Sequence, residues 1–250
     1  MRLEHVSDAN GHPVGAAVPN FVTPPLPDRT KALHGVGVRL EPLTPAHGDE
    51  LWAAFSQDTA GHMWAYLAAG PFADAAEFSA WFTPFCALDS LFLYAIIDTA
   101  SDRAIGFASY LRADPGAGSI EVGWVTFSPQ LQRSSLATDA MVVMMREAFA
   151  LGYRRYEWKC NALNAPSISA AHRLGFSFEG LFRQALTVKG HNRDTAWFAI
   201  IDRDWPALES AFATWLSPEN FDEQGVQRTR LSDLTAHLVE SRWPTLTVTL

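Results

Sequence analysis

The chain has 250 residues, a formal net charge of −8 at pH 7 and two cysteines, Cys86 and Cys160. The acidic balance disfavours binding along a nucleic-acid backbone, which usually requires a basic surface, and it suits an amine-bearing substrate. Two cysteines are too few for a disulfide framework, and no Cys/His cluster has the spacing of a zinc site. No secretion signal and no apolar run of about 20 residues are present, so we expect a cytoplasmic protein without membrane insertion.

Three parts are expected along the chain. Residues 1–35 contain five prolines, which favour extended backbone and predict an N-terminal arm. Residues 36–203 have the hydrophobic periodicity of one α/β domain with the element order βααβββαβαββ. Residues 204–250 predict a partly helical extension. Strands are expected at 36–42, 91–97, 104–112, 119–127, 155–160, 176–188 and 195–201, and helices at 44–55, 73–82, 134–151, 166–174, 205–216 and 232–240.

The most informative segment runs from Glu121 through a polar turn into a helix that begins at Ser134. The first N–H groups of a helix lack intrahelical partners and carry the positive end of the helix dipole. Together they can hold a diphosphate without a metal ion, and small residues let the phosphates approach. On its own the segment leaves two interpretations open, an anion-binding helix start or an ordinary capped core helix.

Residues 132–137, Gln-Arg-Ser-Ser-Leu-Ala, resemble the acetyl-CoA loop of the GNAT acetyltransferase family, whose pattern is Gln/Arg-x-x-Gly-x-Gly/Ala. Ser135 stands at the first glycine position, so a Cβ and a hydroxyl must be tolerated there. Downstream, residues 164–167 (Asn-Ala-Pro-Ser) and 174–176 (Leu-Gly-Phe) resemble the two ends of the family's second signature, a short helix. With residues 64–72, these motifs are most similar to the branch of Rim-type (RimJ/RimL-like) ribosomal-protein alanine acetyltransferases.

The resemblance covers about residues 36–203 and implies a mixed, strongly twisted sheet flanked by helices. Two central parallel strands would splay apart, so that the pantetheine arm of acetyl-CoA lies between them against the backbone of the strand before the loop. The diphosphate would lie at the helix start. The residues that the resemblance implies for cofactor binding are Trp124, Val125, Thr126, Phe127, Gln132, Arg133, Ser134, Ser135, Leu136, Ala137, Thr138, Asn164 and Ser167.

Acetyl transfer requires a neutral amine that attacks a thioester and an acid that protonates the departing thiolate. Many family members supply this acid as a Tyr four residues before the glycine of Leu-Gly-Phe, but that position here is Ala171. We therefore expect Ser167 to be the acid. Glu121 is a candidate base acting through water, and Glu179 is a second; for both, the alternative is a structural or solvated carboxylate. Cys160 is expected to be buried and inert.

The expected acceptor is a primary amine, on a protein N-terminus or on a small molecule. The resemblance places Trp64, Tyr66 and Phe72 near the acceptor entrance, and hydrophobic core is an equally weighted alternative for these aromatic residues. Ser135 and Ala171 also leave open a catalytically silent acyl-CoA-binding module. No metal, nucleic acid or membrane partner is expected, whereas a homodimer is left open. A Rossmann site is disfavoured, since no G-x-G-x-x-G follows a strand.

Overall fold

The computed structural model describes residues 5–244, so residues 1–4 of the expected arm and 245–250 of the expected extension lie outside the described residues. Eight strands form one mixed sheet in the order β3-β4-β5-β6-β7-β8-β10-β9, in which β7 and β8 are parallel. This confirms the predicted α/β class. The strands are β3 (Leu33–His34), β4 (Val38–Pro42), β5 (Leu91–Asp98), β6 (Arg103–Asp114), β7 (Ser119–Phe127), β8 (Arg155–Asn161), β9 (Ser177–Val188) and β10 (His191–Ile201).

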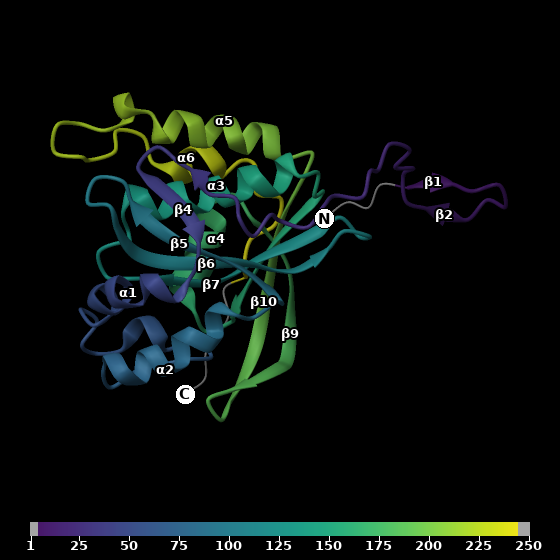
Figure 1. The fold of residues 1–250 in the computed structure, drawn as a ribbon. Helices are drawn as coiled ribbons and strands as arrows, with labels where there is room; N and C mark the ends of the chain where they lie inside the picture. The colour runs from purple at the N-terminus through teal and green to yellow at the C-terminus, as the bar shows by residue number, and fades with distance from the viewer. Residues whose placement is uncertain (1–4, 245–250) are drawn as a thin grey trace.

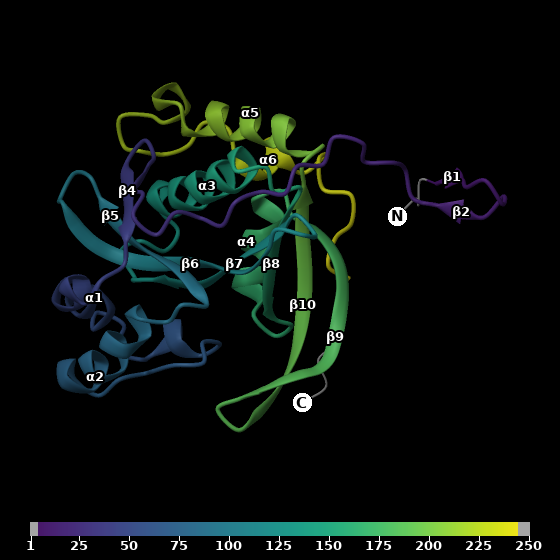
Figure 2. The same cartoon turned by 45° about the vertical axis from the view of Figure 1, so that its right-hand side comes forward.

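Helices pack on both faces of the sheet, as Figures 1 and 2 show. One face is covered by α3, α4, α5 and α6, whose apolar side chains form one core cluster with the sheet. On the other face α1 and α2 form a second cluster over β5 and β6, and the β9–β10 hairpin continues beyond them. The helices are α1 (Gly48–Phe55), α2 (Ala75–Cys86), α3 (Ser135–Ala150), α4 (Ala165–Arg173), α5 (Trp205–Leu216) and α6 (Leu231–Thr235).

The observed order from β4 to β10 matches the predicted βααβββαβαββ, with shifts at several element ends. A 3-10 turn at Pro45–His47 precedes α1, and α2 continues to Cys86 where the pattern predicted an end at Phe82. The last helix is shorter than expected, ending at Thr235. Within residues 5–244, no helix is both long and apolar enough to cross a membrane.

The β9–β10 hairpin differs most from the sequence expectation. The break between the strands expected at 176–188 and 195–201 predicts a turn over the polar run from Lys189 to Asp194, but β10 already begins at His191. Lys189 and Gly190 alone make the turn, with φ of 49° and 78°. Two consecutive positive φ angles are typical of the tight turns that match the twist of a hairpin. The polar residues after Gly190 therefore lie on a strand, with side chains that alternate between the two faces of the hairpin.

The N-terminal residues contain short strand pairings that the proline content did not predict. Val6–Ser7 (β1) and Pro13–Val14 (β2) pair as a small hairpin that projects from the body in Figure 1. Farther along, the guanidinium of Arg29 lies 4.2 Å from the ring centre of Phe92 and donates to the carbonyl of Leu91 at 2.6 Å. β3 then joins the edge of the large sheet by pairing with β4.

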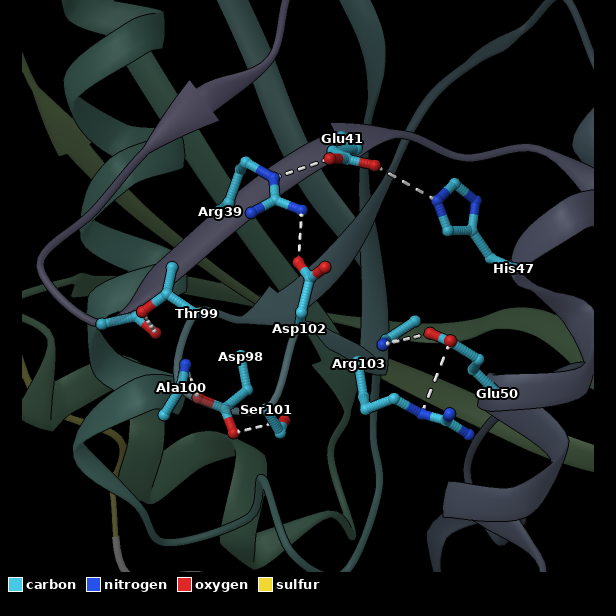
Figure 3. Close-up of polar contacts among 12 residues, drawn as sticks. Arg39, Glu41, His47, Glu50, Asp98, Thr99, Ala100, Ser101, Asp102 and Arg103 are labelled. Atoms are coloured by element: carbon cyan, nitrogen blue, oxygen red, sulfur yellow. Dashed lines mark hydrogen bonds and ion pairs between the residues drawn. The ribbon is translucent and has the colours of Figure 1, made fainter.

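Polar contacts link α1 and the 3-10 turn before it to β4 and β6, as Figure 3 shows. Arg39 on β4 donates to a carboxylate oxygen of Glu41 at 2.6 Å, and the second oxygen of Glu41 lies 3.5 Å from Nε2 of His47. Glu50 on α1 accepts from the N–H of Ala104 at 2.8 Å. Exposed ion pairs contribute only about 0–1 kcal/mol each, so these contacts orient α1 more than they stabilise it.

A buried carboxylate fixes the turn between β3 and β4 to α3. Asp139 is 2% exposed and accepts from the N–H groups of Gly37 at 2.7 Å and Val38 at 3.2 Å. A Cβ at Gly35 would lie 2.5 Å from an oxygen of this carboxylate, so a side chain there would displace it. Burial raises the pKa of Asp139, although the backbone hydrogen bonds act in the opposite direction.

We expect Asp139→Asn to gain stability relative to the native chain as pH rises. The pKa of Asp139 is higher in the folded protein than in the unfolded chain, where it is near 3.8. The carboxyl therefore contributes most to stability when the pH is below the unfolded pKa, and this contribution is lost as the pH rises through the folded pKa. Asn keeps an oxygen acceptor without the ionisation. Urea unfolding between about pH 3 and about pH 7 measures the difference. Asp139→Ala is the control, and should cost about 1–3 kcal/mol because two N–H groups lose their acceptor. A pH-independent difference between Asp and Asn would contradict the assignment.

Candidate active site

The two central parallel strands separate after a short paired stretch. β7 and β8 are in register from Ser119 opposite Arg155 to Val122 opposite Trp158, and the pairing then ends. Residues 123–127 of β7 continue to pair with β6 on their other side. Backbone N–H and C=O groups in a protein interior require partners, so the separated edges are suited to an extended ligand that carries amides.

A β-bulge in β7 lies where the strands separate. The β6–β7 register shifts between the Phe107–Thr126 pair and the Ser109–Gly123 pair, which leaves an additional residue on β7. Trp124 in this bulge has a φ of 49°, and its indole packs against the aromatic side chains of α2. Bulges bend a strand and raise its twist, which accounts for the direction in which β7 leaves β8.

A compact turn connects β7 to α3. The amide of Gln132 donates to the carbonyl of Phe127 at 2.8 Å, across the turn. Arg133 has a φ of 58°, an uncommon left-handed conformation for a residue with a Cβ. The hydroxyl of Ser134 donates to the carbonyl of Leu131 at 2.6 Å. These contacts determine the direction in which α3 begins.

Ser134 caps α3, as the sequence predicted for the helix start. Its Oγ accepts from the N–H of Ala137 at 3.1 Å, and so satisfies one of the first N–H groups of the helix. The N–H groups of Ser135 and Leu136 precede the first residue that can bond within the helix. They remain available to an anion at the positive end of the helix dipole.

The splayed strands and the start of α3 open onto one cavity of about 1480 Å³. Its wall is built from the 3-10 turn η2 (His62–Trp64) and the residues after it, from β6 to β8, from α4, from β10, and from the chain that follows α5. Such a volume exceeds that of most small-ligand sites. The predicted site residues that line it are Tyr66, Glu121, Trp124, Val125, Phe127, Gln132, Arg133, Ser134, Ser135, Ala137, Asn164 and Ser167.

Three residues expected at the cofactor lie behind the wall of this cavity. Thr126 is 1% exposed, and its hydroxyl donates to the carbonyl of Trp124 at 3.0 Å. Leu136 is directed toward Gly37 and packs against the main core. Thr138 is 1% exposed. The family pattern describes the backbone of the loop and not the direction of each side chain. Because α3 begins directly after the loop, some side chains of its first turns point into the core.

Of the three aromatic residues expected at the acceptor entrance, two pack into the hydrophobic core and one lines the cavity. Trp64 is 4% exposed, with ring centres of Phe55 at 5.6 Å and Phe72 at 5.1 Å. Trp64 and Phe72 thus lie in the aromatic cluster of α1 and α2, in agreement with the core alternative. Tyr66 lines the cavity, and its hydroxyl donates to the carbonyl of Leu163 at 3.0 Å.

Ser167 lies at the start of α4, close to the separated end of β8. Its N–H donates to the side chain of Asn164 at 3.1 Å, and its Oγ accepts from Nε1 of Trp158 at 3.0 Å. The neighbouring Cys160 is buried, which raises the pKa of its thiol to about 11 although a hydrogen bond with Ser167 acts against this. A neutral, buried thiol is a poor nucleophile, as the sequence predicted for Cys160.

Glu121 is buried within the cavity wall between two cations. It is 4% exposed, and its carboxylate is paired with Arg112 and, at 2.8 Å, with Nζ of Lys159. Glu179 pairs instead with Arg155 at 2.9 Å and does not line the cavity. Across residues 5–244, no group of three or more His, Cys, Asp or Glu side chains is arranged to hold a metal ion.

The cavity is basic although the chain is acidic, and sequence reasoning missed most of its cations. Arg173 on α4 donates to the hydroxyl of Thr138 at 3.0 Å, beside the start of α3, and burial lowers its pKa. The spacing of Pro166, Ala170 and Arg173 was the available signal, since residues four and seven apart share one helix face. The cationic lining residues are Arg112, Arg133, Lys159, Arg173, Arg193 and Arg230, against the one carboxylate of Glu121.

Comparisons with known proteins agree with this geometry. A family model described as acetyltransferase (GNAT) domain matches residues 38–177, more than half of the chain. A GCN5-related N-acetyltransferase from Brucella melitensis is 45% identical over 87% of this chain and 99% of its own, with a TM-score of 0.84. A probable acetyltransferase (GNAT family) from Chromobacterium violaceum ATCC 12472 is 39% identical over 78% and 98%, with a TM-score of 0.72. The chain belongs to the GNAT acetyltransferase family.

The Rim-type branch predicted from the motifs is represented by a more distant structure. RimL, a ribosomal L7/L12 alpha-N-protein acetyltransferase, is 19% identical over 68% of this chain and 94% of its own, with a TM-score of 0.58. At this identity the likeness shows the fold alone. A search among proteins of curated function finds no match.

We expect Ala137→Asp to abolish acetyl-CoA binding while the fold is kept. Ala137 lines the cavity in the first turn of α3, so a carboxylate there would oppose the diphosphate. An acidic residue in the first turn of a helix does not itself destabilise the helix. Isothermal titration with acetyl-CoA measures the loss. Ala76→Asp, at an exposed position in the first turn of α2, changes the net charge equally and should bind normally. Unchanged affinity in folded Ala137→Asp would reject this cofactor position.

Proposed function

We propose that the protein transfers the acetyl group of acetyl-CoA to a primary amine, on a protein N-terminus or on a small molecule. The observation that carries this proposal is the convergence of two features on one cavity. One is the gap between β7 and β8 beyond Val122 and Trp158, and the other is the start of α3 at Ser135. A gap edged by strand backbone suits an amide-containing arm, and a helix start suits a diphosphate.

The chain's own groups fit acetyl-CoA at the phosphate end of the cavity. The N–H groups of Ser135 and Leu136 would bind diphosphate oxygens, and the guanidinium groups of Arg133 and Arg173 would balance their charge. No carboxylate among residues 5–244 forms an ion pair with Arg173, so its charge is available to an anion. Arg230, from the chain after α5, lines the same cavity and would add to this field.

Acetyl-CoA supplies a thioester in which the carbonyl carbon accepts the amine nitrogen and the carbon–sulfur bond breaks. We assign the proton for the departing sulfur to the hydroxyl of Ser167. Nε1 of Trp158 donates to Oγ of Ser167, so the hydroxyl hydrogen is not used in that bond; it would turn from the neighbouring Cys160 to the departing sulfur. Glu121 would receive the proton of the incoming ammonium through water, since its side chain borders the cavity. The products are an N-acetylated amine and free coenzyme A.

We further propose a cytoplasmic enzyme of Rim-like character. Support comes from residues 64–72 and the two cofactor signatures, together with the fold shared with RimL. The acceptor of RimL is named as a ribosomal protein, and that name is not transferred to this chain. Loops and pocket walls select acceptors, whereas the shared motifs concern the donor.

Binding and turnover are both expected of the intact protein. Calorimetric titration should give saturable one-site binding of acetyl-CoA, and thiol release should follow when amines are added. A panel containing N-terminal peptides and small primary amines identifies the acceptor class. Failure to bind any acyl-CoA would overturn the proposal. Binding without turnover on the whole panel would favour the catalytically silent module instead.

We expect Ser167→Ala to lower the rate of the chemical step more than the affinity for acetyl-CoA. Loss of a general acid typically reduces a rate by about 10²–10⁴-fold. Single-turnover kinetics at saturating acetyl-CoA measures this step directly. Ser169→Ala, on the same helix and also at the cavity, is the matched control and should react normally. A native chemical rate in folded Ser167→Ala would remove this hydroxyl from the mechanism.

A further inference from the structure

The acceptor end of the cavity lies on a charged surface of the sheet. Glu121 pairs with Arg112 and Lys159, and Lys159 continues to Glu157 at 2.7 Å. Arg155 connects Glu157 at 2.7 Å to a further carboxylate on β9. The side chains of Glu121 and Lys159 are only 5% and 6% exposed, so the ion pairs are largely shielded from water. In this network every carboxylate is contacted by a cation.

Arg193 lies beside this network without belonging to it. The residue is on β10 and lines the cavity, and its Nε is buried with no hydrogen-bond partner among residues 5–244. Burial lowers the pKa of Arg193, and the like charge of Arg112 acts in the same direction, while Cys160 and Glu121 act against it. A half-buried guanidinium whose Nε has no hydrogen-bond partner and which forms no ion pair within the described part of the chain is suited to an anionic ligand.

The charges around Arg193 also leave room for an anionic ligand. Over the described residues, the network together with Arg193 holds one cation more than it holds carboxylates. Arg193 is the member for which no ion pair is found there. The cations are Arg112, Arg155, Lys159 and Arg193, and the carboxylates are Glu121, Glu157 and Glu179.

The groups that act electrostatically on Arg193 do not include any residue at the start of α3. Arg193 interacts electrostatically with Glu121 and Cys160, at the point where β7 and β8 separate. From Glu121 to Phe127 the strand runs about 20 Å before the turn to α3 begins. Arg133 and Arg173 lie at the helix start and would balance the diphosphate there, which leaves Arg193 for a different anionic group. Its partner has to come from the molecule that enters at the acceptor end.

Two contacts enclose this end and favour a compact molecule. Nζ of Lys189, at the tip of the β9–β10 hairpin, donates to the carbonyl of Trp64 at 2.8 Å. On the other side, the hydroxyl of Tyr66 donates to the carbonyl of Leu163, in the loop before α4. The segment around Tyr66 is thus tied to both neighbouring walls. A small acceptor fits such an enclosed space better than a peptide chain does.

We propose that Arg193 binds the carboxylate of the acceptor, and that the acceptor is a compact amino acid. This inference rests on the proposed acetyl transfer. The guanidinium group of Arg193 matches a carboxylate with two parallel hydrogen bonds, and Glu121 borders the same cavity within electrostatic range of Arg193. The ammonium gives one proton to Glu121 through water, the amine nitrogen bonds to the acetyl carbon and the carbon–sulfur bond breaks. The nitrogen's second proton replaces the one that Ser167 gives to the departing sulfur. The products are an N-acetylamino acid and coenzyme A.

The test compares free L-amino acids with their primary carboxamides, which keep the amine and the side chain but lack the carboxylate. A carboxamide has the less basic amine, and so more free amine at neutral pH; preference for the acid therefore cannot arise from amine reactivity. We expect kcat/KM to favour the acids by about tenfold to a hundredfold, the range for a charge-assisted hydrogen bond. Arg193→Gln should bring this ratio close to one, mainly through KM, without changing acetyl-CoA affinity.

Two further variants keep the test decisive. Arg193→Lys keeps the positive charge but lacks the two parallel donors of the guanidinium group. Its ratio of kcat/KM for acids to carboxamides should lie between those of the native protein and Arg193→Gln. Arg183→Gln removes an exposed arginine from the same hairpin and should leave the ratio unchanged. Equal or better turnover of carboxamides, a ratio insensitive to Arg193→Gln, or turnover confined to peptides would each overturn the proposal. So would binding of acetyl-CoA with no turnover of any free amino acid. Failure to bind acetyl-CoA at all would instead overturn the proposed acetyl transfer.

Discussion

The end of parallel pairing after Val122 and Trp158 is the constraint on which the rest of the site depends. In an ordinary sheet these strands would remain paired, and no ligand could approach the backbone between them. The bulge at Trp124 changes the direction of β7, so that one edge of the strand leaves its neighbour while the other stays paired with β6. A binding edge is thereby formed in the centre of a sheet, where paired backbone closes one end of the gap and β6 and β10 hold its two sides.

Packing on both faces keeps this gap open. The indole of Trp124 is wedged against α2, with its ring centre 4.8 Å from that of Phe85, so the bulge cannot flatten without opening the aromatic cluster. On the opposite face α3 is fixed to the β3–β4 turn through Asp139. The position of the helix start relative to the gap is thus determined by contacts far from any ligand. Rigid elements of this kind hold binding groups more accurately than loops do.

The sequence predicted the framework of the fold, because strand and helix periods and helix caps are local signals. Period and capping located β7, Ser134 and α3 to within a residue. Side-chain direction was harder, since Thr126 and Thr138 belong to the expected segment yet lie behind the cavity wall. Aromatic side chains suit cores and pockets alike, so the burial of Trp64 could only be learned from tertiary packing.

Arg193 was missed for a different reason. It lies in a polar run that resembles a turn, and only the two-residue turn at Lys189 and Gly190 places it on a strand that faces the cavity. The ion pairs of Glu121 could not be predicted either, because Arg112 and Lys159 lie on neighbouring strands and the sequence does not give the register between strands. The net charge of a chain describes mainly its exposed surface. The electrostatic field inside a cavity depends on which charged side chains the folded sheet brings together.

The cavity wall formed by the end of α5 and the chain that follows it has a consequence for the whole protein. Trp215, Gln227 and Arg230 line the cavity, although they follow the family-matched residues 38–177 by almost 40 positions or more. A ligand that touches both α3 and this wall bridges segments distant in sequence. Occupancy and the docking of the C-terminal segment are then linked equilibria, each favouring the other by the same free energy. A ligand bound there would therefore hold the C-terminal segment in place, and removal of that segment would lower the affinity for the ligand.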